Sequence, residues 1–465
     1  MRTKYIDLVD QTFDFPQDEF QLNGDQLIFH GIDMMQLVKE HGTPLKFNYL
    51  PQISNNIQRC QGWFREAMNA IGYTGKYNYA YCTKSSHFSF VLDEVLKNNV
   101  HLETSSAYDI DIIEHLFLSG KFDASKNIIC NGYKQERYID NIARLINEHS
   151  LNVIPIIDNY TELDLLEQKI NKKVNIGIRI ASEEDPKFEF YTSRLGIRYK
   201  NILPYYQEQI ENNDKVDLKM LHFFINTGIN DNAYYWNELT KCLRVYGELK
   251  KVCPTLDSLN IGGGFPIKKS LAFDYDYPYM VKEILLQVKA VCKEFDIPEP
   301  HIFTEFGSYT VGESGGAIFK ILNQKQQNDR EKWNMIDSSF MTNLPDTWAI
   351  NQRFILLPLN RWEDKYERVL LGGLTCDSDD YYNSEQHTNA IYLPKFDQEK
   401  DLYVGFFNTG AYQETIGGFG GLKHCLIPEP KHILLNRDEN GNLTTEIFSN
   451  EQTAGDYLKL LGYNK

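Results

Sequence analysis

Short apolar runs alternate with amphipathic segments from about residue 77 to about residue 305. Eight runs have the length and the β-branched or aromatic content that is typical of buried strands. These runs are Tyr77–Cys82, Val100–Glu103, Asn127–Cys130, Val153–Ile157, Val174–Ile180, Leu218–Phe224, Ser258–Ile261 and His301–Glu305. The segments Phe88–Asn98, Ala107–Leu118, Tyr138–Asn147 and Tyr279–Phe295 favour helices between them. Alternating strands and helices of this number predict an α/β fold, a closed (β/α)8 barrel of parallel strands.

The pattern changes after about residue 312, where apolar runs follow one another without regular helices between them. These later runs are Trp348–Leu357, Arg368–Leu374, Ala390–Leu393, Leu402–Phe407 and His432–Leu435. The stretch Asp438–Asn442 predicts a hairpin turn, because its Asn-Gly pair suits the positive φ of a tight turn. We therefore predict a barrel over 44–311 and a mainly antiparallel β domain over 312–465. Residues 1–43 look extended and are expected to pack with the β domain.

Composition narrows the possible partners. The chain has 465 residues, enough for a barrel and a second domain, and 42% of them are hydrophobic. A formal net charge of −16 argues against a nucleic-acid partner and is compatible with a cationic substrate. Eight cysteines without a C-x-x-C pair predict reduced thiols in a cytoplasmic protein. We expect neither a signal sequence nor a membrane partner.

Lys84 follows the first predicted barrel strand, in Ala80-Tyr81-Cys82-Thr83-Lys84. The carboxyl ends of barrel strands carry the chemistry of such folds, and a half-buried lysine there can have a lowered pKa. Its amine can then act as a nucleophile and form a Schiff base with an aldehyde cofactor. The alternative is a lysine that extends its amine into solvent.

Two other features are expected at the same rim of the barrel. Gly262-Gly263-Gly264-Phe265-Pro266 follows the seventh strand, where glycines let backbone amides approach a phosphate, although many glycine runs are structural turns. Glu305 ends the eighth strand, where a carboxylate can pair with a protonated ring nitrogen of a cofactor. The alternative for Glu305 is a helix-capping or salt-bridging role.

The C-terminal part adds further candidates. In Cys376-Asp377-Ser378-Asp379-Asp380, the cysteine suits a proton donor and the carboxylates suit a cationic ligand. A metal such as Ca²⁺ is an alternative ligand, although the D-x-D-x-D-G spacing of a calcium loop is absent. Tyr412, in Gly410-Ala411-Tyr412-Gln413-Glu414, is either a hydroxyl donor to a phosphate or a buried structural tyrosine.

In this order, these features resemble the fold-type III pyridoxal-phosphate-dependent amino-acid decarboxylases, from about residue 44 to about residue 425. The stretch 80–84 resembles the cofactor-lysine motif of that family, 262–266 its phosphate loop, and Glu305-Phe306-Gly307 its pyridine-nitrogen motif. Within the family, the chain is most similar to the biosynthetic arginine decarboxylases. That similarity lies in Leu344–Ile350, Thr375–Asp379 and Gly410–Glu414.

The resemblance implies pyridoxal 5'-phosphate as cofactor, bound through Lys84. The expected cofactor-binding residues are Lys84, Glu103, Arg179, Phe224, Thr227, Gly262, Gly263, Gly264, Glu305, Gly307, Ser308 and Tyr412. Cys376 is implied to return a proton to the substrate from the neighbouring subunit of a homodimer or higher oligomer with shared active sites. We predict no metal site, although magnesium assists some members of the family.

Three departures from the family pattern involve the cofactor. Phe224 stands where a histidine usually stacks on the cofactor ring, a contact that phenylalanine can also make. Asn226-Thr227 replaces a Gly-Ser pair, and the threonine keeps a hydroxyl donor. Ser308 stands where ornithine decarboxylases have an arginine, so the phosphate loses one charge-assisted hydrogen bond.

Asp377 and Asp379 favour arginine as substrate, with agmatine and carbon dioxide as products in polyamine biosynthesis, because two carboxylates suit a forked guanidinium. One alternative is a diaminopimelate, ornithine or carboxynorspermidine-type decarboxylase of the same fold. Another is a catalytically inactive homologue that regulates polyamine synthesis. A racemase is disfavoured, because racemases of this fold usually have an arginine where Glu305 stands.

Overall fold

The computed structural model describes residues 15–182, 194–384, 390–418 and 421–463. The chain divides into two compact units. We call Ser54–Pro266 with Tyr275–Thr310 the barrel unit, and Met1–Ile53, Ile267–Asp274 and Val311–Lys465 the sheet unit. Residues 1–14, where we expect no signal sequence, lie outside the described residues. The predicted domain boundaries after residues 43 and 311 stay a prediction.

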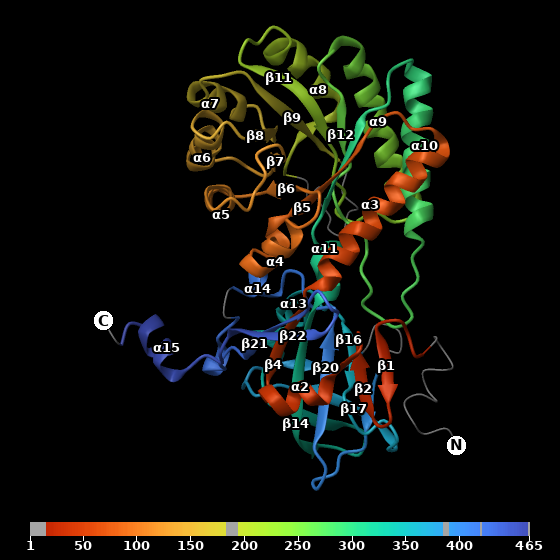
Figure 1. The fold of residues 1–465 in the computed structure, drawn as a ribbon, viewed down its shortest axis with the longest axis vertical. Helices are drawn as coiled ribbons and strands as arrows, with labels where there is room; N and C mark the ends of the chain where they lie inside the picture. The colour runs from red at the N-terminus through yellow and green to blue at the C-terminus, as the bar shows by residue number, and fades with distance from the viewer. Residues whose placement is uncertain (1–14, 183–193, 385–389, 419–420, 464–465) are drawn as a thin grey trace. The chain divides into compact units, whose positions relative to one another are not determined.

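Parallel strands and flanking helices build the barrel unit (Figure 1). The strands are β5 (Tyr77–Cys82), β6 (His101–Thr104), β7 (Asn127–Cys130), β8 (Asn152–Ile157), β9 (Val174–Ala181), the short β10 (Ile197–Arg198), β11 (Val216–His222), β12 (Ser258–Asn260) and β13 (His301–Phe306). The helices are α3 (Pro51–Ile71), α4 (Ser89–Val95), α5 (Ala107–Leu118), α6 (Glu136–Asn147), α7 (Glu162–Lys169), α8 (Tyr199–Tyr205), α9 (Ala233–Val252) and α10 (Tyr277–Phe295).

The barrel closes through parallel pairing. The order β5-β6-β7-β8-β9-β11-β12-β13 returns to β5, because β13 pairs with β5 and β8 pairs with β9. Apolar side chains of Ala80, Ile129, Ile154, Met220 and Phe303 pack together in a buried cluster that draws on five of these strands. This arrangement confirms the predicted (β/α)8 barrel, and it sets the carboxyl ends of all eight strands around one rim.

The sheet unit is mainly antiparallel. Its N-terminal strands are β1 (Phe20–Asn23), β2 (Gln26–Phe29), β3 (Ile32–Asp33) and β4 (Leu45–Tyr49). Its later strands are β14 (Gly315–Gln326), β15 (Lys332–Ile336), β16 (Ile355–Pro358), β17 (Tyr366–Gly372), β18 (Tyr381–Tyr382), β19 (Ile391–Pro394), β20 (Leu402–Phe407), β21 (Lys431–Arg437) and β22 (Leu443–Ser449). Two pairs, β15 with β17 and β21 with β4, are parallel. The predicted mainly antiparallel β domain is therefore confirmed.

Short helices interrupt the sheet unit where the sequence analysis expected none. They are α2 (Met34–His41), α12 (Phe340–Asn343), α13 (Pro345–Ala349), α14 (Gln413–Gly417) and α15 (Ala454–Leu460). A further short helix, α11 (Ser308–Val311), ends at the first residue of this part of the sheet unit. The expectation of extended structure throughout the first forty residues was wrong. Asp33 caps α2 by accepting hydrogen bonds from the backbone N–H groups of Met35 and Gln36, and one face of the helix is buried.

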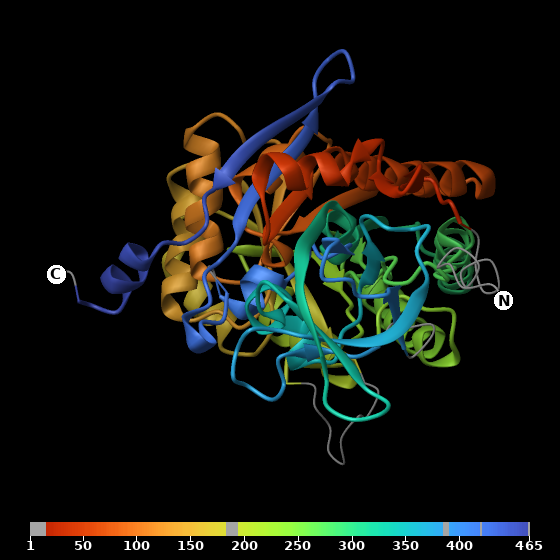
Figure 2. The ribbon, with the colours of Figure 1, turned by 90° about the horizontal axis from the view of Figure 1, so that it is seen from below.

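The run from Trp348 to Leu357 was also only partly a strand. Trp348 belongs to α13, which begins at Pro345, and the strand β16 starts at Ile355. Proline fits the first turn of a helix, so the apolar residues after it continue a helix before the chain extends. The hairpin prediction is confirmed: the long β21–β22 ribbon, visible in Figure 2, turns at Gly441 with φ of 80°.

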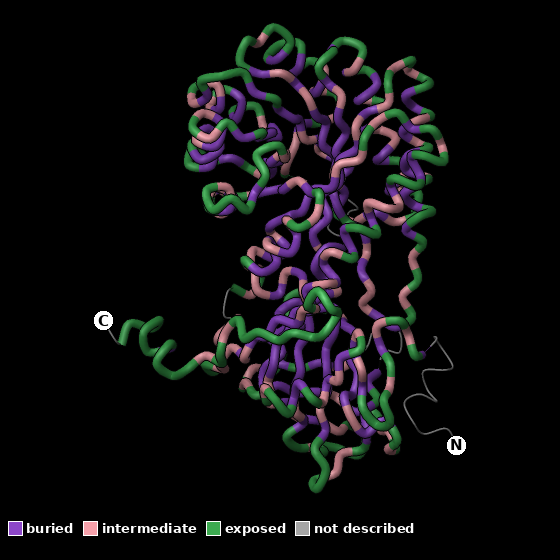
Figure 3. The backbone as a smooth tube through the Cα atoms, in the orientation of Figure 1, coloured by how far each residue is buried: buried purple, intermediate pink, exposed green. Residues whose placement is uncertain are grey.

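In both units, the buried residues lie mainly along the strands (Figure 3). Strands are mostly buried, whereas the outward turns of helices and the C-terminal α15 are mostly exposed. Among the described residues, no helix is both long enough and apolar enough to pass through a bilayer.

Candidate active site

Lys84 lies immediately beyond the carboxyl end of β5. The last four residues of that strand are buried, and the chain then enters a short 3-10 helix, Thr83–Ser85. Ser85 Oγ donates a 2.8 Å hydrogen bond to the carbonyl of Cys82 and so fixes the turn. Lys84 Nζ donates a 2.8 Å hydrogen bond to Glu103 Oε2. The lysine side chain is 42% exposed and that of Glu103 is 0% exposed, so the amine faces a buried carboxylate and still reaches solvent.

Glu103 and Glu305 form a buried carboxylate pair that shares one amide. Asn131 Nδ2 donates a 2.9 Å hydrogen bond to an oxygen of each carboxylate. Burial raises the pKa of Glu103; Lys84 opposes this shift, and the charge of Glu305 adds to it. Burial also acts to raise the pKa of Glu305, but His222, Lys84 and Asn131 outweigh it and hold that pKa well below its ordinary value. Glu305 is therefore ionised.

Three residues that the sequence analysis missed hold Glu305 in place. His222 Nε2 lies 3.1 Å from Glu305 Oε2, and Asn260 Nδ2 donates a 2.6 Å hydrogen bond to Oε1 beside that of Asn131. His222 ends β11, Asn260 ends β12, and Asn131 follows β7. Polar residues at the ends of otherwise apolar strands were the signal that could have found them.

The triple-glycine turn packs too closely on its neighbours for any side chain. A Cβ on Gly263 would lie 2.2 Å from the carbonyl oxygen of Glu305, and one on Gly264 would lie 2.7 Å from the Cα of Gly228. Gly262 has a φ of 69° and Gly264 one of 111°, which other residues rarely adopt. The turn is thereby fixed beside the end of β13.

Several polar atoms of the barrel unit are buried without a hydrogen-bond partner among the described residues. They include Arg179 Nε, Thr227 Oγ1 and His222 Nδ1. The Arg179 guanidinium lies 5.6 Å from the centroid of the Phe224 ring. The segment after Thr227 is tied to the glycine turn, because the Ile229 N–H donates a 2.9 Å hydrogen bond to the carbonyl of the third glycine. Buried polar atoms are rarely unpaired, so these atoms point to a polar group that would complete them.

Gly307 brings the ends of β13 and β5 together. A Cβ on Gly307 would lie 2.9 Å from the Cβ of Ser85 and 3.1 Å from that of Cys82. Cys82 Sγ also donates a 3.0 Å hydrogen bond to the carbonyl of Glu305. Ser308, the first residue of α11, is half-buried. The lysine turn and the glutamate strand are therefore one packed assembly.

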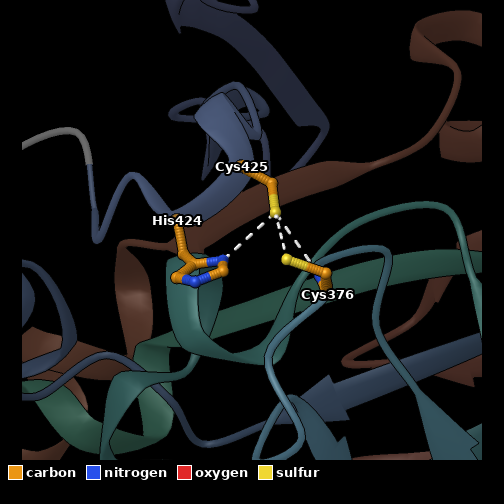
Figure 4. Close-up of side chains that lie close together, drawn as sticks. All are labelled: Cys376, His424 and Cys425. Atoms are coloured by element: carbon orange, nitrogen blue, oxygen red, sulfur yellow. Dashed lines mark hydrogen bonds between the residues drawn. The ribbon is translucent and has the colours of Figure 1, made fainter.

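The remaining predicted site residues belong to the sheet unit. Cys376 is exposed, and its Sγ lies 3.4 Å from that of Cys425 (Figure 4). The hydrogen bond with Cys425 and the charge that Cys425 can carry raise the pKa of the Cys376 thiol, so it keeps its proton at neutral pH. Asp377 is half-buried and accepts a 2.9 Å hydrogen bond from the backbone N–H of Asp379, which is exposed. Tyr412 is half-buried with a φ of 68°.

Six of the predicted site residues thus form two clusters, one in each unit. Lys84, Glu103 and Glu305 meet in the barrel unit, and Cys376, Asp377 and Asp379 share one loop of the sheet unit. The individual roles of all predicted site residues stay a prediction.

Comparison with known proteins identifies the class. Residues 55–312 match the family described as "Pyridoxal-dependent decarboxylase, pyridoxal binding domain". This match covers more than half of the chain, and the chain belongs to that family. It is therefore a lyase of the pyridoxal-dependent decarboxylase class, with pyridoxal phosphate as its cofactor.

Particular relatives carry more specific names. The chain is 21% identical to a biosynthetic arginine decarboxylase of Tolumonas auensis, over 93% of this chain and 88% of the relative. Its fold is similar to that of the biosynthetic arginine decarboxylase of Campylobacter jejuni, with a TM-score of 0.82, 20% identity and coverage of 98% and 90%. It is also similar to a diaminopimelate decarboxylase of M. jannaschii in complex with L-lysine, with a TM-score of 0.79, 18% identity and coverage of 95% and 97%.

The barrel residues fit the cofactor of this family. The Lys84 amine beside a buried acid suits the cofactor's aldehyde, and the ionised Glu305 suits its ring nitrogen. The glycine turn, which has no room for side chains, suits its phosphate. Arg179 Nε and Thr227 Oγ1, which have no hydrogen-bond partner in the described part of the chain, offer donors of the kind that a phosphate accepts.

Proposed function

We propose that this protein decarboxylates a basic amino acid, most specifically L-arginine, to agmatine and carbon dioxide. The observation that carries the proposal is the joined set of Lys84, Glu103 and Glu305 beside the triple-glycine turn, within a chain of the pyridoxal-dependent decarboxylase family. The names of the arginine decarboxylase relatives support the choice of arginine.

Pyridoxal phosphate, when bound, supplies an aldehyde that takes up an amino group and a ring that withdraws electrons from the bonds of the α-carbon. Lys84 would supply the amine that holds the cofactor. Glu305 supplies the negative charge that keeps a ring nitrogen protonated, and His222, Asn131 and Asn260 keep its carboxylate oriented. Arg179, Thr227 and the backbone of the glycine turn would hold the phosphate.

Decarboxylation exchanges one substituent of the α-carbon for another. The carboxylate leaves as carbon dioxide, and the electrons of the broken bond stay on the α-carbon. One proton must then take the place of the carboxylate on that carbon. Cys376 is our candidate for the donor of that proton, because its thiol is accessible and its pKa is raised. Asp377 and Asp379 are our candidates for binding the guanidinium of the substrate.

We also propose a homodimer or higher oligomer in which the loop that carries Cys376 serves the site of a neighbouring subunit. Related decarboxylases have been solved in complex with L-lysine, a basic amino acid.

All eight cysteines of this chain are free, which supports the proposed cytoplasmic location.

A panel of amino acids tests the function. Carbon dioxide release is measured with arginine, ornithine, lysine and diaminopimelate in the presence of pyridoxal phosphate. Arginine should give the highest kcat/KM. The Lys84→Ala variant should lose activity and the absorbance band that borohydride reduction removes. Lys97→Ala, at a lysine whose side chain is 60% exposed in the same unit, is the matched control and should keep both.

A second candidate is diaminopimelate decarboxylation, favoured by the fold similarity to diaminopimelate decarboxylases. Highest turnover on diaminopimelate would select this candidate and reject arginine. Activity that survives in Lys84→Ala at the level of the unchanged protein would reject the proposed chemistry altogether.

A further inference from the structure

Three metal-binding atoms gather on the sheet unit, two from the adjacent residues His424 and Cys425 and one from Cys376, 49 positions from Cys425 in the sequence (Figure 4). The Sγ atoms of Cys376 and Cys425 lie 3.4 Å apart, and His424 Nδ1 lies 3.1 Å from Cys425 Sγ. All three donor atoms lie within 4.8 Å of one another, and all three residues are exposed. A dissolved ion can therefore reach them.

The spacing and the donor types suit zinc. Zinc bonds of about 2.3 Å to sulfur and about 2.0 Å to nitrogen in a tetrahedron place neighbouring donors about 3.5–3.8 Å apart. The observed separations of 3.1 and 3.4 Å differ from that range by only a few tenths of an ångström. Thiolate and imidazole ligands select zinc over calcium or magnesium, and three protein ligands leave a fourth position open.

Asp377 adds the feature that commonly accompanies a metal-bound histidine. Its Oδ2 lies 3.7 Å from His424 Nε2, and the other ring nitrogen, Nδ1, faces Cys425 Sγ. A small shift of either side chain would let Nε2–H donate to this carboxylate, which would orient the ring with Nδ1 toward a metal. Four groups from two loops are therefore arranged as a ligand set and its support.

Both loops are anchored by hydrogen bonds outside the cluster. Buried Asp380 accepts a 2.7 Å hydrogen bond from Thr375 Oγ1 and a 2.8 Å bond from the N–H of Phe340. On the other loop, Thr342 Oγ1 donates a 2.7 Å bond to the carbonyl of Leu422. The donor atoms are thus positioned before any ion binds, which lowers the entropic cost of binding.

We propose that Cys376, Cys425 and His424 form a zinc site whose occupation inhibits the enzyme. Binding converts two thiols to thiolates, releases two protons and forms two Zn–S bonds and one Zn–N bond, without any change of oxidation state. A metal-bound Cys376 has no proton to give to the α-carbon. This inhibitory consequence rests on the proposed function, whereas the binding of metal does not.

Oxidation of the two thiols to a disulfide by a peroxide is the competing use of the same pair. A disulfide involves only Cys376 and Cys425, and it does not explain why His424 and Asp377 lie beside them. The metal site uses all four groups, so we favour it, and the experiment below distinguishes it from a disulfide.

The test titrates the metal-free holoenzyme, reduced with a phosphine, with Co²⁺ and then with Zn²⁺. We expect one Co²⁺ per chain, with the near-ultraviolet charge-transfer band of cobalt–thiolate bonds and visible bands of tetrahedral cobalt, and bleaching of both by one equivalent of Zn²⁺. The same Zn²⁺ should abolish carbon dioxide release, and a chelator should restore it.

Variants separate the ligands from other surface groups. Cys425→Ser and His424→Gln should lose the charge-transfer band or bind Co²⁺ far more weakly, and Asp377→Asn should weaken binding by about 10- to 100-fold. His115→Gln, at an exposed histidine of the barrel unit, is the control and should leave the titration unchanged. Circular dichroism confirms that each variant is folded.

Three results would overturn the site: no thiolate band in the reduced protein, an equal affinity in Cys425→Ser, or a Cys376–Cys425 disulfide as the only product when peroxide and Zn²⁺ compete. Metal binding without loss of turnover would keep the site and reject Cys376 as proton donor. Absence of turnover on every amino acid would reject the proposed function, and the cobalt spectra would still decide the metal site.

Discussion

The two chemical clusters of this protein are opposite in environment. In the barrel unit, Glu103 and Glu305 are buried and compensated by Lys84, His222 and two amides. In the sheet unit, Cys376, His424 and Cys425 are exposed; they contact one another, and hydrogen bonds elsewhere in their loops hold the backbone that carries them.

The difference shows how each environment tunes a group. Burial makes the pKa of each carboxylate depend strongly on the next charge, because a low dielectric strengthens every interaction. Exposure leaves the sulfur atoms accessible to protons, metals and oxidants, with little effect on folding. The barrel cluster is therefore suited to fixed electrostatics, and the sheet cluster to a reversible reaction with a solute.

The largest expected effect is that of Glu305→Gln. A neutral amide keeps the shape but has one acceptor oxygen where the carboxylate has two, and it removes the charge that would hold a ring nitrogen protonated. The kcat of decarboxylation should fall by about 10²- to 10³-fold, with a smaller change in KM. Glu103→Gln, the matched exchange at the acid whose pKa is raised, should lower kcat by a smaller factor. Steady-state kinetics with saturating cofactor measures both, and equal losses would contradict the division of roles.

The glycine turn should respond next. Gly263→Ala places a methyl group 2.2 Å from the carbonyl of Glu305, so the turn or the end of β13 must move. We expect a loss of about 2–3 kcal/mol in the free energy of unfolding and weaker binding of pyridoxal phosphate. Gly62→Ala is the control, because this helical glycine has only one atom within 4 Å of its Cβ position, at 3.9 Å. Urea unfolding measures both variants, and an unchanged midpoint for Gly263→Ala would reject the steric argument.

Much of the barrel was predictable, because its apolar residues recur with the spacing of strands and helices and its candidate site residues lie at the ends of strands. All eight predicted strands are present, and those around Asn127–Cys130 and Tyr77–Cys82 have the predicted bounds. Lys84 and Glu305 could be placed because a parallel barrel brings all strand ends to one rim. The network around Glu305 was harder, because Asn131 and Asn260 are short polar residues that also fit ordinary turns.

The sheet unit was less predictable for physical reasons. Strand β14 begins with Gly315-Gly316 and ends in polar residues, and Lys320 divides its apolar part into short pieces, so the sequence gives a weak strand pattern there. Its partner strands are brought together only by the fold. The proposed zinc ligands cannot be read from the sequence as one set. Cys376 and Cys425 are 49 residues apart and do not form a short ligand motif, so only the packing of two loops reveals them.

The same exchange in the two environments should have unequal effects. Cys242→Ser buries a hydroxyl at a site that is 0% exposed in α9, which should cost about 1–2 kcal/mol. Cys425→Ser, at an exposed position, should change the free energy of unfolding by less than about 0.5 kcal/mol. Denaturant unfolding of both variants gives the comparison. A larger cost at Cys425 would mean that the sulfur cluster is structural and would contradict its description as a reactive surface site.

The last prediction concerns the pH dependence of stability. Glu305 has a folded pKa of about 2, below its ordinary value of 4.5, so its stabilising contribution is complete above pH 4.5 and is lost as the pH falls toward 2. Relative to Glu305→Gln, which cannot titrate there, the unchanged protein should lose about 1 kcal/mol of stability between pH 5.5 and pH 4.

Urea unfolding of both proteins at several pH values in that window measures this difference. The sign is decisive, because a carboxylate whose folded pKa was raised by burial would gain relative stability as the pH fell. A difference that stays constant or grows toward acid pH would show that burial outweighs His222 and Lys84, and that Glu305 is not the permanently charged partner its proposed role requires.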